Sequence, residues 1–188
     1  MNPAPAGHDA AIGFRPLGRA DFPLLSTWFA AAHVAPWWQE PSDLDGVEAR
    51  YGPVIDGTDA TEARIVTLDG APLGLVLRYR IADEEVWCIT LAPSGAPLDA
   101  FGIDYLIGDP DRIGRGLGPR MLTAFVADSW NRYPDCPACV VGVHQGNRPS
   151  WRTLQRVGFT RIWTGALISD DPSDAGPQAV FVLERPTS

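Results

Sequence analysis

The sequence lacks lysine, has few cysteines and contains no long apolar run. All 15 of its Lys and Arg positions are arginine, which we attribute to the codon bias of the source and not to chemistry. No apolar stretch approaches the roughly 20 residues that a membrane-spanning helix needs. Residues 1–11 carry neither a basic region nor a long apolar core, so we expect a flexible lead-in, no signal peptide and a cytoplasmic protein.

The three cysteines are an odd number, which does not suggest a disulfide framework. Cys136 and Cys139 have the spacing typical of metal or redox sites, but no second pair completes a zinc site. The pair also follows an expected helix instead of opening one, which is the wrong place for a lowered thiol pKa. We therefore expect no metal and two incidental loop thiols.

Acidic residues outnumber basic ones, 23 to 15, which gives a formal net charge of −8. This balance argues against nucleic acid as a partner and fits a cationic small molecule better. An acidic balance is also ordinary for a soluble protein. With 188 residues, 45% of them apolar, the chain is long enough for one domain with a sizeable core.

Hydrophobic periodicity predicts one α/β (α+β) domain over residues 12–188, built on a mixed sheet. We expect strands at residues 12–17, 64–68, 72–81, 86–91, 101–107, 138–143, 159–166 and 179–183. We expect helices over residues 22–29, from a cap at Ser42 or Asp43 to about residue 51, from the glycine loop to about residue 132, and over 149–156. Residues 33–41 are expected to be a broken connection and residues 52–61 a polar loop.

A glycine-rich loop precedes the main expected helix. Residues 113–118 read Ile-Gly-Arg-Gly-Leu-Gly, and Pro119 suits the first helical turn. Glycines let successive backbone N–H groups converge, so that these groups, the helix N-terminus and Arg115 form a phosphate site. The spacing is neither the Walker pattern nor the dinucleotide fingerprint. Taken alone, the alternation is equally typical of a plain tight turn.

Asp104 is an acid in an otherwise apolar strand directly before this loop. Alternation along residues 102–107 puts Asp104 on the face opposite Ile103 and Tyr105. A carboxylate in such a strand is costly unless it faces a cleft. The alternative is the exposed face of an antiparallel strand. No serine lies in a Gly-x-Ser-x-Gly context, so Ser-His-Asp hydrolysis is a poor fit.

Four segments together resemble the GNAT acyltransferases, and among them the aminoglycoside 6'-N-acetyltransferases and the siderophore lysine N-acyltransferases. These segments are His33 to Trp38 (His-x-x-x-Trp-Trp), Gly-Ile-Asp at 102–104, the glycine loop, and Asn147 with the Gly-Phe at 158–159. The superfamily usually has Gln or Arg where Ile113 opens the loop. The resemblance implies the GNAT fold, in which two parallel neighbouring strands splay apart at the acetyl-CoA site and helices flank the sheet.

The resemblance also implies acetyl-CoA as co-substrate, direct transfer in a ternary complex, and roles for individual residues. Asp104 would bind the acceptor ammonium group and help deprotonate it, and backbone N–H groups around Ile107 would stabilise the oxyanion. Cofactor contacts would come from Ile107, Gly114, Arg115, Gly116, Leu117, Gly118, Pro119, Asn147 and Arg152. Acceptor contacts would come from Trp37, Trp38, Tyr79, Glu84, Asp104 and Tyr105.

Blander interpretations exist for three of these features. The tryptophan pair is also typical of simple core packing, and Glu84 of a solvated turn. His33 could act as a base, but a lone histidine near a helix end is more often a structural hydrogen-bonding group.

Two departures from the aminoglycoside enzymes matter. Gly142 stands where those enzymes carry a second Asp, and Leu154 where they carry a Tyr near the coenzyme sulfur. His144, Ser150 or an ordered water are the available substitutes. The expected acceptor is an aminoglycoside amine at the 6' or 2' position, the latter as in kasugamycin acetyltransferases, so that acetylation confers antibiotic resistance. A siderophore-type lysine or hydroxylysine acyltransferase, and a non-catalytic CoA-binding module, remain alternatives. A homodimer is expected by resemblance only.

Overall fold

Seven strands of the described chain form one mixed sheet in the order β1-β2-β3-β4-β5-β7-β6. The computed structural model describes residues 10–169 and 172–186. Only residues 10 and 11 of the expected lead-in fall within these ranges. The strands are β1 (Ile12–Pro16), β2 (Glu62–Leu68), β3 (Ala71–Arg80), β4 (Phe101–Ile107), β5 (Ala138–His144), β6 (Thr160–Ala166) and β7 (Pro177–Glu184).

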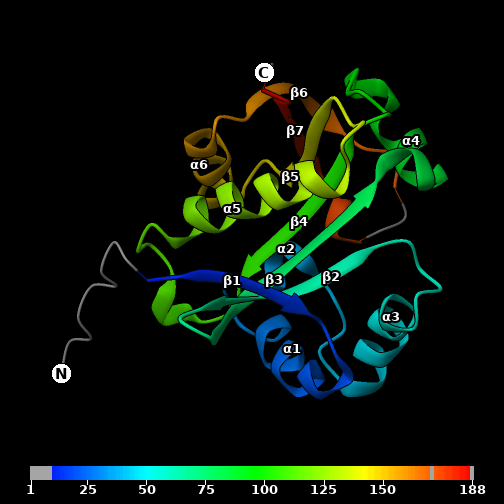
Figure 1. Ribbon diagram of the computed structural model, residues 1–188. Coiled ribbons are helices and arrows are strands. Elements are labelled where there is room, and N and C mark those ends of the chain that lie inside the picture. The colour runs from blue at the N-terminus through cyan, green and yellow to red at the C-terminus, as the bar shows by residue number, and fades with distance from the viewer. Residues whose placement is uncertain (1–9, 170–171, 187–188) are drawn as a thin grey trace.

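Helices cover both faces of this sheet (Figure 1). They are α1 (Phe22–Phe29), α2 (Ala35–Trp38), α3 (Leu44–Asp56), α4 (Glu85–Leu91), α5 (Leu117–Arg132) and α6 (Arg148–Val157). Alternation along β3 separates two cores. Leu75 packs with Leu25 of α1, whereas Val76 packs with Met121 of α5. No helix in the described ranges is both long enough and apolar enough to cross a membrane.

The sheet opens between β4 and β5. These parallel strands pair only at Phe101 with Cys139 and at Gly102 with Val140. On its other edge β4 stays paired with β3 from residue 101 to residue 107. The divergence beyond residue 102 therefore comes from β5 leaving β4. The splayed pair of strands that the resemblance to the GNAT fold implies is confirmed.

Several predicted elements are confirmed closely. The hairpin β2–β3 turns at Asp69 and Gly70, whose φ angles of 51° and 82° are both in the left-handed region. Strand β4 has the predicted bounds, and α5 ends at Arg132 as expected. Asp43 is the N-cap of α3, because its side chain accepts a hydrogen bond from the backbone N–H of Gly46 at 2.8 Å.

Three local predictions were wrong. Residues 86–91 are in helix α4 instead of a strand: Thr90 and Leu91 are buried while Val86 and Ile89, three residues apart, are exposed, which is a helical pattern. Helix α3 continues to Asp56, where the prediction placed a polar loop from residue 52, and it ends at Gly57 with φ 73°. The two tryptophans of the expected broken connection lie in the short helix α2.

Candidate active site

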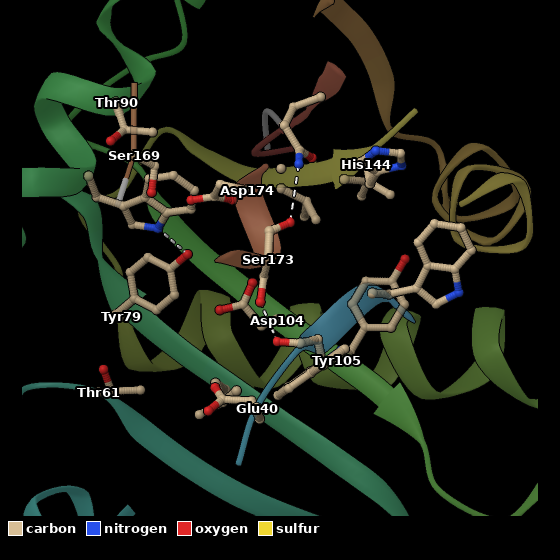
Figure 2. A pocket seen from close by; sticks show the side chains of 18 of the residues that line it. Glu40, Thr61, Tyr79, Thr90, Asp104, Tyr105, His144, Ser169, Ser173 and Asp174 are labelled. Atoms are coloured by element: carbon tan, nitrogen blue, oxygen red, sulfur yellow. Dashed lines mark hydrogen bonds between the residues drawn. The ribbon is translucent and has the colours of Figure 1, made fainter. Parts of the chain in front are cut away.

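A cavity of about 370 Å³ opens where β4 and β5 separate (Figure 2). Asp104 and Tyr105 of β4 line it on one side, and residues 141–144 of β5 line it on the other. All six residues predicted to contact the acceptor line this cavity, as does Asn147. These six are Trp37, Trp38, Tyr79, Glu84, Asp104 and Tyr105.

Asp104 lies in the middle of the lining residues drawn in Figure 2. It pairs in register with Leu77 of β3, whose side chain belongs to the core under α1, whereas its neighbour Ile103 belongs to the core under α5. Because successive side chains of β4 point to opposite faces of the sheet, Asp104 projects from the face that α1 covers, at the level of the cavity. The cleft-facing interpretation of Asp104 therefore holds, and the exposed-strand alternative does not.

The cavity is strongly acidic. Five carboxylates line it, from residues distant in the sequence: Glu40, Asp59, Glu84, Asp104 and Asp174. Among the lining residues that the structure describes, Arg50 is the one lysine or arginine side chain. Burial raises the pKa of Glu84 above its ordinary value, and the nearby negative charge of Asp59 raises it further. Five carboxylates around one cavity favour a multiply charged cation as ligand.

The segment from His33 to Trp38 spans the mouth of the gap between the two strands. His33 Nε2 lies 2.9 Å from the carbonyl oxygen of Ile107, at the end of β4. The Trp37 ring lies 5.7 Å from the His144 ring, at the end of β5. His33 therefore makes a hydrogen bond to the end of β4, as expected of a structural histidine near a helix end. The segment contacts one strand through each end.

Aromatic rings form much of the cavity wall. Trp38 lines the cavity and also stacks on Phe29 of α1, with ring centroids 5.8 Å apart, so it packs in the core as well. The Tyr79 ring covers Gly102, where a Cβ atom would lie only 2.5 Å from the ring. Trp87 of α4 donates its indole N–H to the Tyr79 hydroxyl. Burial raises the pKa of Tyr79 well above its ordinary value, so this phenol stays protonated.

The glycine loop has the backbone that an anion cradle requires. Gly114 and Gly116 have φ angles of 74° and 75°, and only glycine adopts such angles without strain. Gly116 occupies the N-cap position of α5, so no side chain caps the first N–H groups of this helix. Arg115 is exposed beside them. Leu117 is buried in the core, so any contact it makes with a cofactor comes from its backbone.

Helix α6 packs closely against the start of α5. A Cβ atom at Gly118 would lie 3.2 Å from the Thr153 side chain, a tight contact that glycine avoids. Arg152, the residue before Thr153, is exposed. The glycine loop and Arg152 thus lie in the same region, although neither is part of the cavity lining.

The free edge of β4 presents backbone groups to the gap. The Gly108 N–H donates to the Leu73 carbonyl oxygen at 3.0 Å, and the Ile81 N–H donates to the Ala100 carbonyl oxygen at 3.1 Å. Even-numbered residues between 100 and 108 therefore form their backbone hydrogen bonds with the β3 side. In an antiparallel ladder the intervening residues point the other way. The peptide groups of Ile103, Tyr105 and Ile107 therefore point toward β5.

Two hydroxyl groups meet at the start of α6. The Tyr105 hydroxyl lies 2.5 Å from Ser150 Oγ, and both residues line the cavity. Asn147 Oδ1 accepts from the Ser150 N–H at 3.3 Å and so caps α6. Leu154, by contrast, is completely buried in the core under α5. A side chain at position 154 faces the core and not the cavity.

Sequence reasoning missed several lining residues: Glu40, Arg50, Asp59, Trp87 and Asp174. They come from different helices and loops, and none lies in a recognisable motif. For Trp87, the helical period of residues 85–91 is the signal that could have predicted an inward-facing side chain. Within the described residues, no group of three or more His, Cys, Asp or Glu side chains could hold a metal ion.

Comparison with known proteins agrees with this geometry. Aminoglycoside N(6')-acetyltransferases type 1 from Klebsiella pneumoniae and Serratia marcescens are each 24% identical over 179 residues, which covers 93% of this chain and 84% of theirs. A solved aminoglycoside acetyltransferase, AAC(6')-Ib in complex with coenzyme A and kanamycin, superposes with a TM-score of 0.78 at 23% identity, covering 93% of this chain and 95% of that one. At this identity the superposition shows the shared fold. A family model described as the acetyltransferase (GNAT) domain matches residues 18–166. The chain belongs to the GNAT family of acetyltransferases.

Proposed function

We propose that the chain transfers the acetyl group of acetyl-CoA to a primary amine of an aminoglycoside, at the 6' or the 2' position. The observation that carries this proposal is the acidic cavity around Asp104, at the point where β4 and β5 separate. An amino sugar carries several ammonium groups, and five carboxylates between aromatic walls suit such a ligand. The names of the relatives support the same acceptor class.

The residues present fit acetyl-CoA as the donor. Gly114 and Gly116 leave the uncapped N-terminus of α5 open to a pyrophosphate, and Arg115 adds a positive charge. The pantetheine arm would enter between β4 and β5, with Asn147 beside it. When bound, acetyl-CoA supplies an activated thioester carbonyl. The Ile107 N–H points toward β5, the direction that an oxyanion hole on this edge requires.

Asp104 is the residue that would prepare the acceptor. Its carboxylate would attract the ammonium group and hold it at the level where the strands diverge. The amine must lose a proton before it attacks the carbonyl carbon, and that proton passes to Asp104 or through it to water. The remaining carboxylates of the cavity would bind the other ammonium groups and so orient the sugar. No covalent enzyme intermediate is needed.

The Ser150–Tyr105 pair would assist the leaving sulfur, because both hydroxyls lie in the cavity whereas position 154 faces the core. Both hydroxyls lie in the cavity beside Asn147. Burial and the Asp104 charge raise the pKa of Tyr105, so its hydroxyl keeps its proton and remains a hydrogen-bond donor. If Tyr105 donates to Ser150, the Ser150 proton can be directed toward the thiolate.

Release of the CoA thiol from acetyl-CoA, measured against kanamycin, kasugamycin, lysine and hydroxylysine, tests this proposal. We expect turnover with at least one aminoglycoside, and the position of the new amide, read by NMR, separates the 6' from the 2' amine. Turnover on lysine or hydroxylysine alone would contradict the aminoglycoside assignment in favour of a siderophore-type acceptor. Binding of acetyl-CoA without thiol release for any amine would contradict catalysis.

A further inference from the structure

Arg50 is a cation inside an acidic cavity. It projects from α3 into the lining, where its Nε lies 3.5 Å from Glu40 and its Nη1 lies 3.8 Å from Asp59. Burial lowers the pKa of Arg50, but the surrounding acidic groups outweigh this effect, so the pKa is raised. The groups responsible are Tyr51, Glu40, Asp59 and Asp104. The positive charge of Arg50 also lowers the pKa of Glu84. One guanidinium thus acts on four of the five cavity carboxylates.

The contacts of Arg50 are loose compared with those of the structural arginines. Arg78, which is 2% exposed, contacts Glu62 at 2.5 Å and Asp128 at 2.6 Å. Charge-assisted hydrogen bonds between such groups are normally about 2.7–2.9 Å long, and both Arg50 distances exceed this range. The Arg50 side chain is also 43% exposed. Arg50 is therefore held by charge and by the Tyr51 ring, 5.4 Å from its Cζ, more than by directed hydrogen bonds.

We propose that Arg50 is a resident counter-cation that occupies the place of one acceptor ammonium group beside Glu40 and Asp59, and so determines how many positive charges a good acceptor carries. This inference rests on the proposed function. A carboxylate pair whose negative charge is already partly offset by a guanidinium attracts a further ammonium group less strongly. Arg50 therefore weakens the binding of an acceptor with many amines more than the binding of one with few. In this sense Arg50 is a specificity-determining residue. Without Arg50, the negative charges of Glu40 and Asp59 are no longer offset by its guanidinium and attract an additional ammonium group more strongly.

The test compares Arg50→Met with Arg19→Met. Methionine keeps the apolar stem of arginine and removes its charge. Arg19 bonds to Glu48 and Asp56 on the side of α3 away from the cavity, at 2.8 to 3.1 Å, so its loss changes the net charge equally without changing the lining. Kanamycin and neomycin, of which neomycin carries more amino groups, are titrated calorimetrically into the CoA-bound enzyme at low and at high salt.

We expect Arg50→Met to increase the preference for neomycin over kanamycin about tenfold at low salt, which corresponds to roughly 1.4 kcal/mol. High salt should reduce this gain. Arg19→Met should leave the preference within about twofold of the wild type, because Arg19 is paired with Glu48 and Asp56 and does not line the cavity. Arg50→Lys should keep the wild-type preference, and Asp59→Asn added to Arg50→Met should remove most of the gain.

An unchanged preference in Arg50→Met, with wild-type protein that binds both aminoglycosides, would overturn the inference and leave the proposed function standing. An equal gain in Arg19→Met would overturn it too, because net charge alone would then explain the result. Wild-type protein that binds neither aminoglycoside would overturn the proposed function, and this inference with it.

Discussion

Gly116→Ala is expected to weaken acetyl-CoA binding without slowing the chemical step. Gly116 has a φ of 75°, and nothing lies within 4 Å of the position that a Cβ atom would occupy. The penalty is therefore backbone strain and not a clash. An L-residue in this conformation costs roughly 1–2 kcal/mol. The strained loop would turn its peptide groups slightly, which moves the N–H groups away from the pyrophosphate, while most of the strain remains. We expect KM for acetyl-CoA to rise about tenfold with kcat nearly unchanged, the pattern of lost uniform binding.

Gly57→Ala is the matched control for this prediction. Gly57, at the end of α3, has a φ of 73° and equally open space around a Cβ atom. The same strain should lower the melting temperature of both variants by a similar amount, about 2–8 °C for a chain of this size. Steady-state kinetics and thermal unfolding of both variants separate the two effects. Equal losses of stability with no rise in KM in Gly116→Ala would refute the cofactor role of the loop.

Two further predictions concern Tyr105 in the cavity and the ion pairs of Glu62. Tyr105→Phe should lower kcat about tenfold with KM for the amine little changed, whereas Tyr133→Phe, remote from the cavity, should keep kcat; equal kcat values would contradict the Tyr105–Ser150 role. Glu62→Gln should lower the free energy of unfolding by about 1–3 kcal/mol at neutral pH, because it removes an acceptor of Arg78 and Arg132. Burial raises the pKa of Glu62, but hydrogen bonds from Arg132 and Arg78 outweigh it and the pKa is lowered. The wild type should thus keep its full excess in the free energy of unfolding over Glu62→Gln at pH values above 4.5, the ordinary pKa of Glu62. This excess, measured by urea unfolding, should disappear as the pH falls through the lower pKa of the folded protein. A difference that persists in acid would contradict the ion-pair explanation.

Local patterns in the sequence predicted the elements that carry the site. Alternation identified β4 and the orientation of Asp104, and the glycine loop located the start of α5. These predictions held because each depends on neighbouring residues alone. Residues 86–91 failed for the opposite reason: Val86, Trp87 and Ile89 have strand propensities, but β3 and β4 pair directly and leave no place for another strand between them.

The acidic character of the cavity could not be predicted in the same way. Glu40, Arg50, Asp59 and Asp174 are separated along the chain and meet only because α2, α3 and the segment before β7 pack around the divergent strands. Net charge indicated a cationic partner, but it could not place that partner. The sequence also could not show whether the side chain at position 154 reaches the cavity, because only the packing of α6 shows that Leu154 faces the core.

Asp104→Asn tests the central claim most directly. Asparagine keeps the size of the side chain and removes the negative charge that would bind and deprotonate the acceptor amine. CoA thiol release is measured with the best aminoglycoside at saturating acetyl-CoA. We predict a fall in kcat of about 10²–10⁴-fold, the usual range for loss of a general base, with KM for acetyl-CoA unchanged. Activity within a few-fold of the wild type would contradict the account, because the cavity would then not be built around Asp104.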